Sequence, residues 1–316
     1  ILSQSEQPVE WGSGKNNRII DISFDDEDAA EIERISSKIV GSIPDIVDKL
    51  SKTTAERMAL DFADEWRSMR YIEERDLRGF RDRLEDRWGD GLDALRVLLE
   101  VSRQLGEQAL ERLSSSKARK GKIVRSALIQ LHVRACQISA EIIVLLENGF
   151  ADGALARWRT LHEITVVCLL LSDGDDELSR RYLDHEFVES KKAMDRFLID
   201  HESLGFRRPA KREIESVNRA YQRVLSKYGP RFRHEYGWAS AVINIERPRF
   251  IDLQIAAGKG AMHSHYKMAS YSVHATSKAL TSRIGTIYSD SHVIAGASNA
   301  GLEEAGVKLA SSLALV

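Results

Sequence analysis

The sequence predicts an all-α protein, built as a bundle of long antiparallel helices with an N-terminal helical arm. Only five prolines occur in 316 residues, and the long intervals between them carry apolar residues at three- and four-residue spacing. Stops such as Asn148-Gly149 and Ser172-Asp173-Gly174 separate the apolar segments. Short loops with glycine are typical of helices that pack as antiparallel neighbours.

The first part of the chain is expected to lie outside the bundle. Residues 1–25 are polar with scattered glycine, which predicts a flexible arm, and residues 26–83 are expected to form a helical extension. Acidic residues in its first turn suit the positive end of a helix dipole. Pro44 is expected to divide residues 25–50 into two short helices. The following stretch to residue 83 is amphipathic, which predicts packing against a neighbour.

Residues 84–316 are expected to form the bundle domain, with an irregular insertion at 229–259. A basic loop near residues 114–122 interrupts the helical pattern. The later helices are expected at residues 123–148, 152–172, 175–203, 208–228, 260–283 and 300–315. Two short alternating segments, Asp21–Phe24 and Ala241–Ile245, are candidates for peripheral strands.

Composition limits the classes of function. Lys and Arg together number 46 against 48 for Asp and Glu, so a nucleic-acid contact would have to be local. Cys136 and Cys168 lie in apolar helical pattern, which indicates reduced buried thiols and a cytoplasmic protein. The sequence lacks the ~18–20 consecutive apolar residues of a membrane span, so no membrane contact is expected. It also lacks a P-loop, a dinucleotide fingerprint and an esterase elbow, so no cofactor is predicted.

The candidate site is a polar cluster within the most apolar part of the chain. Arg157, Arg159, His162 and Glu163 are flanked by apolar runs on both sides. Charges persist in such surroundings only when they are paired. Arg159, His162 and Glu163 share one helix face through their three- and four-residue spacing, whereas Arg157 lies on another flank. The cluster is therefore either an internal ion pair that fixes helix register, or a phosphate-binding cation beside a proton-transferring imidazole.

The spacing Arg157-x4-His162 resembles the motif of the HEPN superfamily, which comprises all-helical nucleotide-binding proteins. Its ribonuclease members cleave RNA without a metal. The resemblance implies that His162 exchanges the proton of the attacking 2′-hydroxyl while Arg157 or Arg159 holds the phosphate. It also implies a homodimer, because these ribonucleases build a composite site from two copies. Trp158 departs from the common pattern, which has a polar residue directly after the arginine.

A broader resemblance covers about residues 84–316. It rests on Trp88-Gly-Asp-Gly, on Glu147-Asn-Gly with the Ala156–Glu163 segment, on Arg181-Tyr182 and on Tyr271-Ser-Val-His274. These segments resemble an uncharacterised bacterial helical family that is known only as a domain of unknown function. The resemblance implies the fold, a role near defence or stress systems, and a shared polar centre of Arg159, Glu163 and His274.

Two functions remain open at this point. One is a metal-independent ribonuclease or toxin-like effector acting on RNA. The other is a non-catalytic helical interaction module that binds a partner protein in a defence or stress complex. His185 and Glu189 are four residues apart on one helix face, which is compatible with a metal site. A solvated or capping role also fits this spacing, and no metal site is predicted. The basic and aromatic stretch 231–238 is compatible with phosphate contact or with an ordinary loop anchored by its rings.

Overall fold

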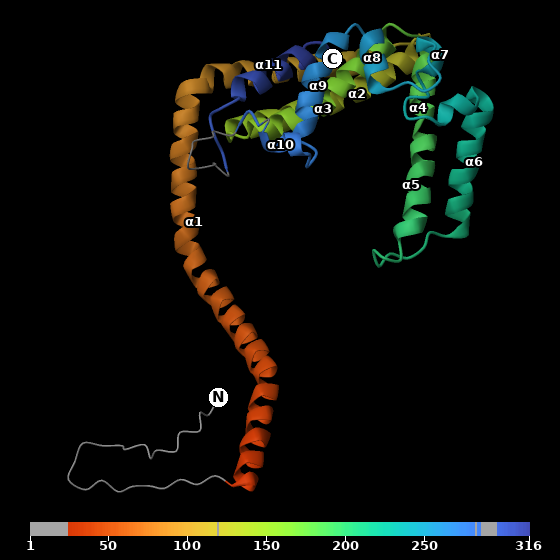
Figure 1. The fold of residues 1–316 in the computed structure, drawn as a ribbon. Coiled ribbons are helices and arrows are strands. Elements are labelled where there is room, and N and C mark those ends of the chain that lie inside the picture. The colour runs from red at the N-terminus through yellow and green to blue at the C-terminus, as the bar shows by residue number, and fades with distance from the viewer. Residues whose placement is uncertain (1–24, 119, 282, 286–295) are drawn as a thin grey trace. The chain divides into compact units, whose positions relative to one another are not determined.

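The computed structural model describes residues 25–118, 120–281, 283–285 and 296–316, and all regular elements in these ranges are helical (Figure 1). The all-α prediction is therefore confirmed. The chain divides into two compact units, residues 1–76 and 77–316. The elements are α1 Asp26–Ser115, α2 Lys122–Glu147, α3 Ala151–Ser172, α4 Asp176–Asp184, α5 Glu186–Asp200, α6 Lys211–Tyr228, η1 Pro230–Arg233, α7 Ser240–Ile243, α8 Phe250–Ala256, η2 Gly260–Met262, α9 His263–Tyr271, α10 Ser277–Thr281 and α11 Leu302–Leu313.

Helix α1 continues through Pro44, so the predicted division into two short helices is wrong. Proline removes the N–H that would bond to the carbonyl four residues earlier. The surrounding residues are exposed, so water can solvate that carbonyl. The helix begins at a cap made by Asp25, whose Oδ1 accepts from the Glu27 and Asp28 N–H groups at 2.9 Å each.

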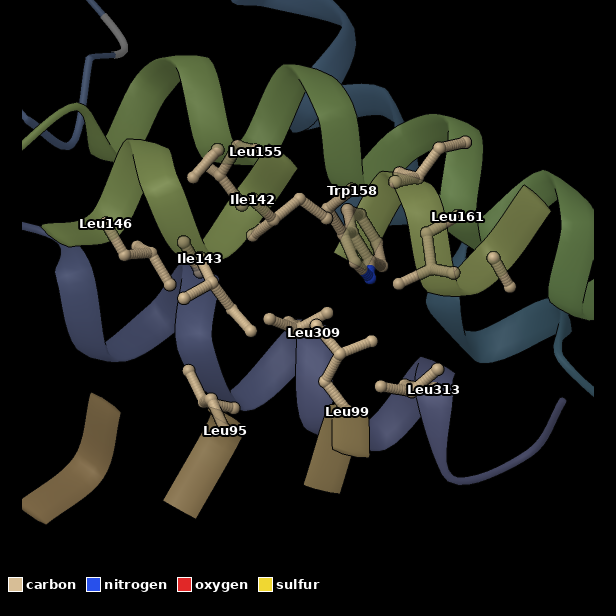
Figure 2. Close-up of a cluster of buried hydrophobic side chains, with 14 of the residues drawn as sticks. Leu95, Leu99, Ile142, Ile143, Leu146, Leu155, Trp158, Leu161, Leu309 and Leu313 are labelled. Atoms are coloured by element: carbon tan, nitrogen blue, oxygen red, sulfur yellow. The ribbon is translucent and has the colours of Figure 1, made fainter. Parts of the chain in front are cut away.

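The first core of the second unit lies between α2, α3, α11 and the part of α1 after Leu77. Figure 2 shows its apolar side chains meeting from these four helices, with Trp158 among them. The Trp158 ring is fully buried, and its Nε1 donates to Ser312 Oγ on α11 at 2.9 Å. This hydrogen bond satisfies the indole N–H within an otherwise apolar region.

Gly149 makes the tight connection between α2 and α3. Its φ of 76° is a left-handed conformation that side chains other than glycine rarely adopt. A Cβ at this position would lie 2.7 Å from both the Phe80 ring and the Ser298 carbonyl oxygen. The close approach places the start of α3 directly beside α2 and the C-terminal segment.

A second core is formed mainly by α3 to α8 with Tyr266 of α9. The stretch 229–259 supplies buried rings to it, including Phe232, Trp238 and Phe250. The basic and aromatic stretch 231–238 is therefore anchored by its rings, which was one of the two possibilities that its sequence left open. The strand candidate Ala241–Ile245 does not form a strand. A short helix occupies Ser240–Ile243, and the left-handed Asn244, with φ 53°, ends it. The other strand candidate, Asp21–Phe24, lies outside the described residues.

Asp176, the first residue of α4, joins that helix to the start of α2. Its carboxylate accepts hydrogen bonds from the backbone N–H groups of Gly121, Ile123 and Val124 at 2.8–3.1 Å, which caps the start of α2. The N–H of Val124, followed by those of Gly121 and Ile123, lowers the pKa of the Asp176 carboxyl. The cap is thus a charged hydrogen bond at the positive end of a helix.

The helix expected at 175–203 is interrupted at His185, which separates α4 from α5. The buried ring of His185 contacts the His234 carbonyl oxygen through Nε2 at 2.9 Å. Burial lowers the pKa of His185. Helices α5 and α6 then lie side by side as an antiparallel pair (Figure 1).

Candidate functional site

The side chains of residues 157–163 on α3 point in three directions. Trp158, Leu161 and His162 face the interior, with His162 only 2% exposed. Arg157 faces α2, where its Nη2 lies 2.5 Å from the Glu141 carboxylate. Arg159 and Glu163 face α9 and are partly buried. The expected separation of Arg157 from the other three residues is therefore present.

Arg159 and Glu163 form the predicted ion pair, with 3.3 Å between Nη2 and Oε1. Tyr266 of α9 lies between them: its hydroxyl accepts from Arg159 Nη2 at 2.6 Å and donates to Glu163 Oε1 at 2.5 Å. The Arg159 guanidinium also lies 4.8 Å from the centre of the Tyr266 ring, a cation–π contact. Burial, followed by the hydrogen bond to Glu163, raises the pKa of Tyr266 to about 12.

His162 belongs to a second chain of hydrogen bonds. Gln254 Nε2 can only donate, so His162 Nε2 accepts at 2.8 Å and the imidazole proton resides on Nδ1. The Gln254 amide oxygen in turn accepts from His263 Nδ1 at 2.8 Å. The imidazole stacks on Trp158 with ring centres 5.1 Å apart. Burial, with a smaller contribution from the Lys259 charge, lowers the pKa of His162 to about 4.

These groups make up what we call the polar centre. It consists of Arg159, His162, Glu163, Gln254, His263 and Tyr266. Burial keeps His162 neutral above about pH 4, and its Nε2 already accepts a hydrogen bond from the Gln254 amide. Arg159 is engaged by a carboxylate and a phenol. These contacts hold α3, α8 and α9 together.

His274 does not join the polar centre, so the prediction of a network with Arg159 and Glu163 is wrong in this respect. The expected helix at 260–283 ends at Tyr271, and His274 lies beyond that end with an exposed side chain. It borders a cavity of about 550 Å³ together with Arg283 and the first turn of α3. Tyr266, eight residues earlier and inside the helix, takes the bridging position instead.

Arg157 and His162 are likewise not brought together. Arg157 and Glu141 line a largely apolar cavity of about 880 Å³ between α1, α2 and α3. His162 instead contacts the Gln254 amide of α8 and the Trp158 ring. The two residues of the Arg-x4-His spacing therefore face different surroundings.

Sequence reasoning missed Gln254 and Tyr266. Gln254 is fully buried, and a buried amide needs hydrogen-bond partners. The sequence around it reads as an ordinary short apolar helix, which does not reveal that burial. Tyr266 follows His263 by three residues on α9, so the two rings share a face and their centres lie 6.3 Å apart. The Nδ1 of His263 donates to the Gln254 amide oxygen.

Replacement of Glu163 by alanine should lower stability by about 1–2 kcal/mol, because the Tyr266 hydroxyl and the Arg159 guanidinium lose a partly buried acceptor. Glu163→Gln keeps an oxygen for the phenol and should cost less. Thermal melting of the two variants and the wild type provides the comparison. A loss of ~3–5 kcal/mol, as expected for a fully buried pair, would contradict the partial exposure, and an unchanged melt of Glu163→Ala would show that the bridge contributes nothing.

Within the described residues, no group of three or more histidine, cysteine or acidic side chains lies close enough to hold a metal ion. Cys136 and Cys168 are free and buried. Helix α2 is long and apolar enough to cross a bilayer by length and composition, but the core helix of a globular protein meets the same criterion. One third of its apolar window is buried in this structure.

Comparison with known proteins identifies a family. A model described as a family of unknown function (DUF5677) matches residues 125–291, which is more than half of the chain, and the chain belongs to this family. The expectation of an uncharacterised family is thereby confirmed, whereas the HEPN-like motif is not. No curated protein and no solved structure matches the chain.

Proposed function

We propose that this member of the DUF5677 family is a non-catalytic helical interaction module that joins a protein complex through the first unit of the chain. Within that unit we call residues 26–76 the arm. The observation that carries the proposal is a row of exposed apolar side chains along the arm, which we call the arm stripe. Its members are Ile32, Ile35, Ile39, Ile43, Ile46, Leu50, Met58, Phe62, Trp66 and Met69, each 44–60% exposed.

An exposed row of this length supports an association surface. Monomeric proteins rarely expose large contiguous apolar patches, and those that occur commonly mark binding sites. Each aliphatic or aromatic side chain of this size contributes roughly 1.5–3 kcal/mol when it passes from full exposure to burial. Helices gain most of their stability from packing an amphipathic face rather than from intrinsic propensity. A partner along the stripe would therefore stabilise both the arm and the complex.

The polar centre gives less support to a ribonuclease. A general base must come within hydrogen-bond reach of the proton it removes, yet His162 is 2% exposed and its Nε2 is occupied by Gln254. A phosphate-holding cation must lie beside that base, yet Arg157 pairs with Glu141 toward α2. Cleavage would require both groups to leave their present partners.

The setting of the module follows from the resemblance described above, which favours bacterial defence or stress systems. As a module of such a system, the chain would bind another protein through its own surface. The arm is suited to this role because it offers a long apolar face that remains exposed among the described residues.

RNA cleavage by the purified chain, measured with mixed RNA in EDTA, distinguishes the interaction module from the ribonuclease hypothesis. We expect the purified wild-type chain to leave RNA intact, because His162 is buried, its Nε2 accepts a hydrogen bond from Gln254, and Arg157 pairs with Glu141. His162→Gln, which keeps a hydrogen-bonding side chain for Gln254, is the matched variant. RNA cleavage by the wild type that disappears in a folded His162→Gln variant would overturn the proposal.

A further inference from the structure

The spacing of the arm stripe is regular. Ile32, Ile35 and Ile39 follow steps of three and four, and the same 3-4-4 pattern repeats 11 residues later through Ile43, Ile46 and Leu50. Beyond Leu50 the stripe resumes eight residues later at Met58, with Thr54 at the intervening position, and then continues at four-residue steps to Trp66. Its mean period is thus slightly above the 3.6 residues of a straight helix, so the apolar face drifts slowly around the arm in the sense that favours right-handed winding.

The two ends of the stripe mirror one another. Counting forward from Ile32, the stripe advances by three, four and four residues to reach Ile43. Counting backward from Met69, it retreats by three, four and four residues to reach Met58. An identical arm running in the opposite direction therefore brings every stripe residue of one end to the height of a stripe residue of the other.

This register pairs each isoleucine with a side chain of a different shape. Residue i of one copy meets residue 101 − i of the other, which sets four contacts at each end: Ile32 with Met69, Ile35 with Trp66, Ile39 with Phe62, and Ile43 with Met58. Two contacts join a β-branched isoleucine to an aromatic ring, and two join one to an unbranched methionine, so no contact brings two aromatic rings together. A parallel arrangement would instead place two Trp66 rings and two Phe62 rings against themselves.

Charge favours the same direction. Residues 26–33 carry five acidic side chains and no basic one, namely Asp26, Glu27, Asp28, Glu31 and Glu33. Parallel pairing would set these acids against their own copies, which is destabilising. Antiparallel pairing sets them against residues 68–75, which contain Arg70 and Arg75 beside two acids. The antiparallel helix dipoles are also favourable.

We propose that the partner of the arm is a second copy of this chain, paired antiparallel about a two-fold axis between Leu50 and Ser51. The contact is isologous, so each end of one arm meets the opposite end of the other. From Ile32 to Met69 the paired stripe runs for about 55 Å at 1.5 Å per residue. This inference rests on the proposed interaction function and names the partner of the same surface.

Cysteine pairs test the register directly. Full-length Ile35→Cys and Trp66→Cys chains are mixed, allowed to exchange and oxidised. The native Cys136 and Cys168 are buried, so the wild type should give no cross-link. Ser37→Cys mixed with Asp64→Cys is the matched control, because these residues also sum to 101 but lie on the opposite face of the helix. Thermal melting of each variant verifies that the second unit remains folded.

We expect the Ile35→Cys and Trp66→Cys mixture to form a species of twice the 35.6 kDa chain mass, at least ten times faster than the control pair. Rapid linkage of Ile35→Cys chains to one another would overturn the antiparallel direction. A folded chain that stays uncross-linked in every mixture would overturn the second copy as partner. Neither result contradicts an interaction module with a different partner, whereas RNA cleavage lost in His162→Gln would overturn that function itself.

Discussion

Replacement of Trp158 by alanine should destabilise the second unit by about 3–5 kcal/mol, the usual cost of deleting a large buried aromatic side chain. The ring is fully buried between α2, α3 and α11, as Figure 2 shows. Its loss removes the stacking surface of His162 and leaves Ser312 Oγ without the indole donor. Chemical denaturation with urea measures the change.

Trp158→Phe is the control for this prediction. It keeps an aromatic ring beside His162 but removes the N–H donor, so we expect a smaller loss than in Trp158→Ala. If both variants unfold at the wild-type urea concentration, Trp158 does not anchor the core. If the phenylalanine variant loses as much as the alanine variant, the hydrogen bond to Ser312 outweighs the packing.

Acid should destabilise the folded second unit between about pH 6.5 and pH 4. The pKa of His162 is about 4 when folded, against 6.5 for an ordinary histidine. In this window the unfolded chain binds a proton that the folded chain does not, so stability falls as pH falls. The separation of the two pKa values corresponds to about 3 kcal/mol at the acidic end, and most of it develops by pH 5.

His162→Gln isolates this contribution. Glutamine cannot titrate, so the variant should show a shallower loss of stability between pH 6.5 and pH 4, whatever its stability at neutral pH. Some slope should persist, because burial also lowers the pKa of His185. Urea denaturation at half-unit pH intervals gives both curves. Parallel curves for wild type and variant would mean that His162 is not held neutral by burial.

The helices of the second unit were largely predictable from the sequence. The expected ranges 123–148, 152–172 and 208–228 agree with α2, α3 and α6 to within three residues at each end. These segments have strong apolar periodicity and clear stops, so local pattern and tertiary packing act in the same direction. The interruption at His185 was not predictable, because it depends on a contact with the backbone of His234, which is distant in sequence.

The site was predictable only where its partners share one helix. Arg159 and Glu163 are four residues apart, so their pairing follows from helical geometry. Tyr266 and Gln254 reach α3 from elements about a hundred residues later, and no local signal fixes that approach. His274 was chosen because its helix was expected to continue, whereas the helix ends at Tyr271.

Sedimentation equilibrium at micromolar concentration tests the central claim most directly. We predict that the full-length wild type sediments above its 35.6 kDa chain mass. The variant Ile39→Glu with Phe62→Glu should return to that mass, because it places charge within the arm stripe, while Ser37→Glu on the opposite face should behave as wild type. A wild-type chain that sediments at 35.6 kDa, or a double variant that associates as strongly as wild type, would contradict self-association through the arm stripe.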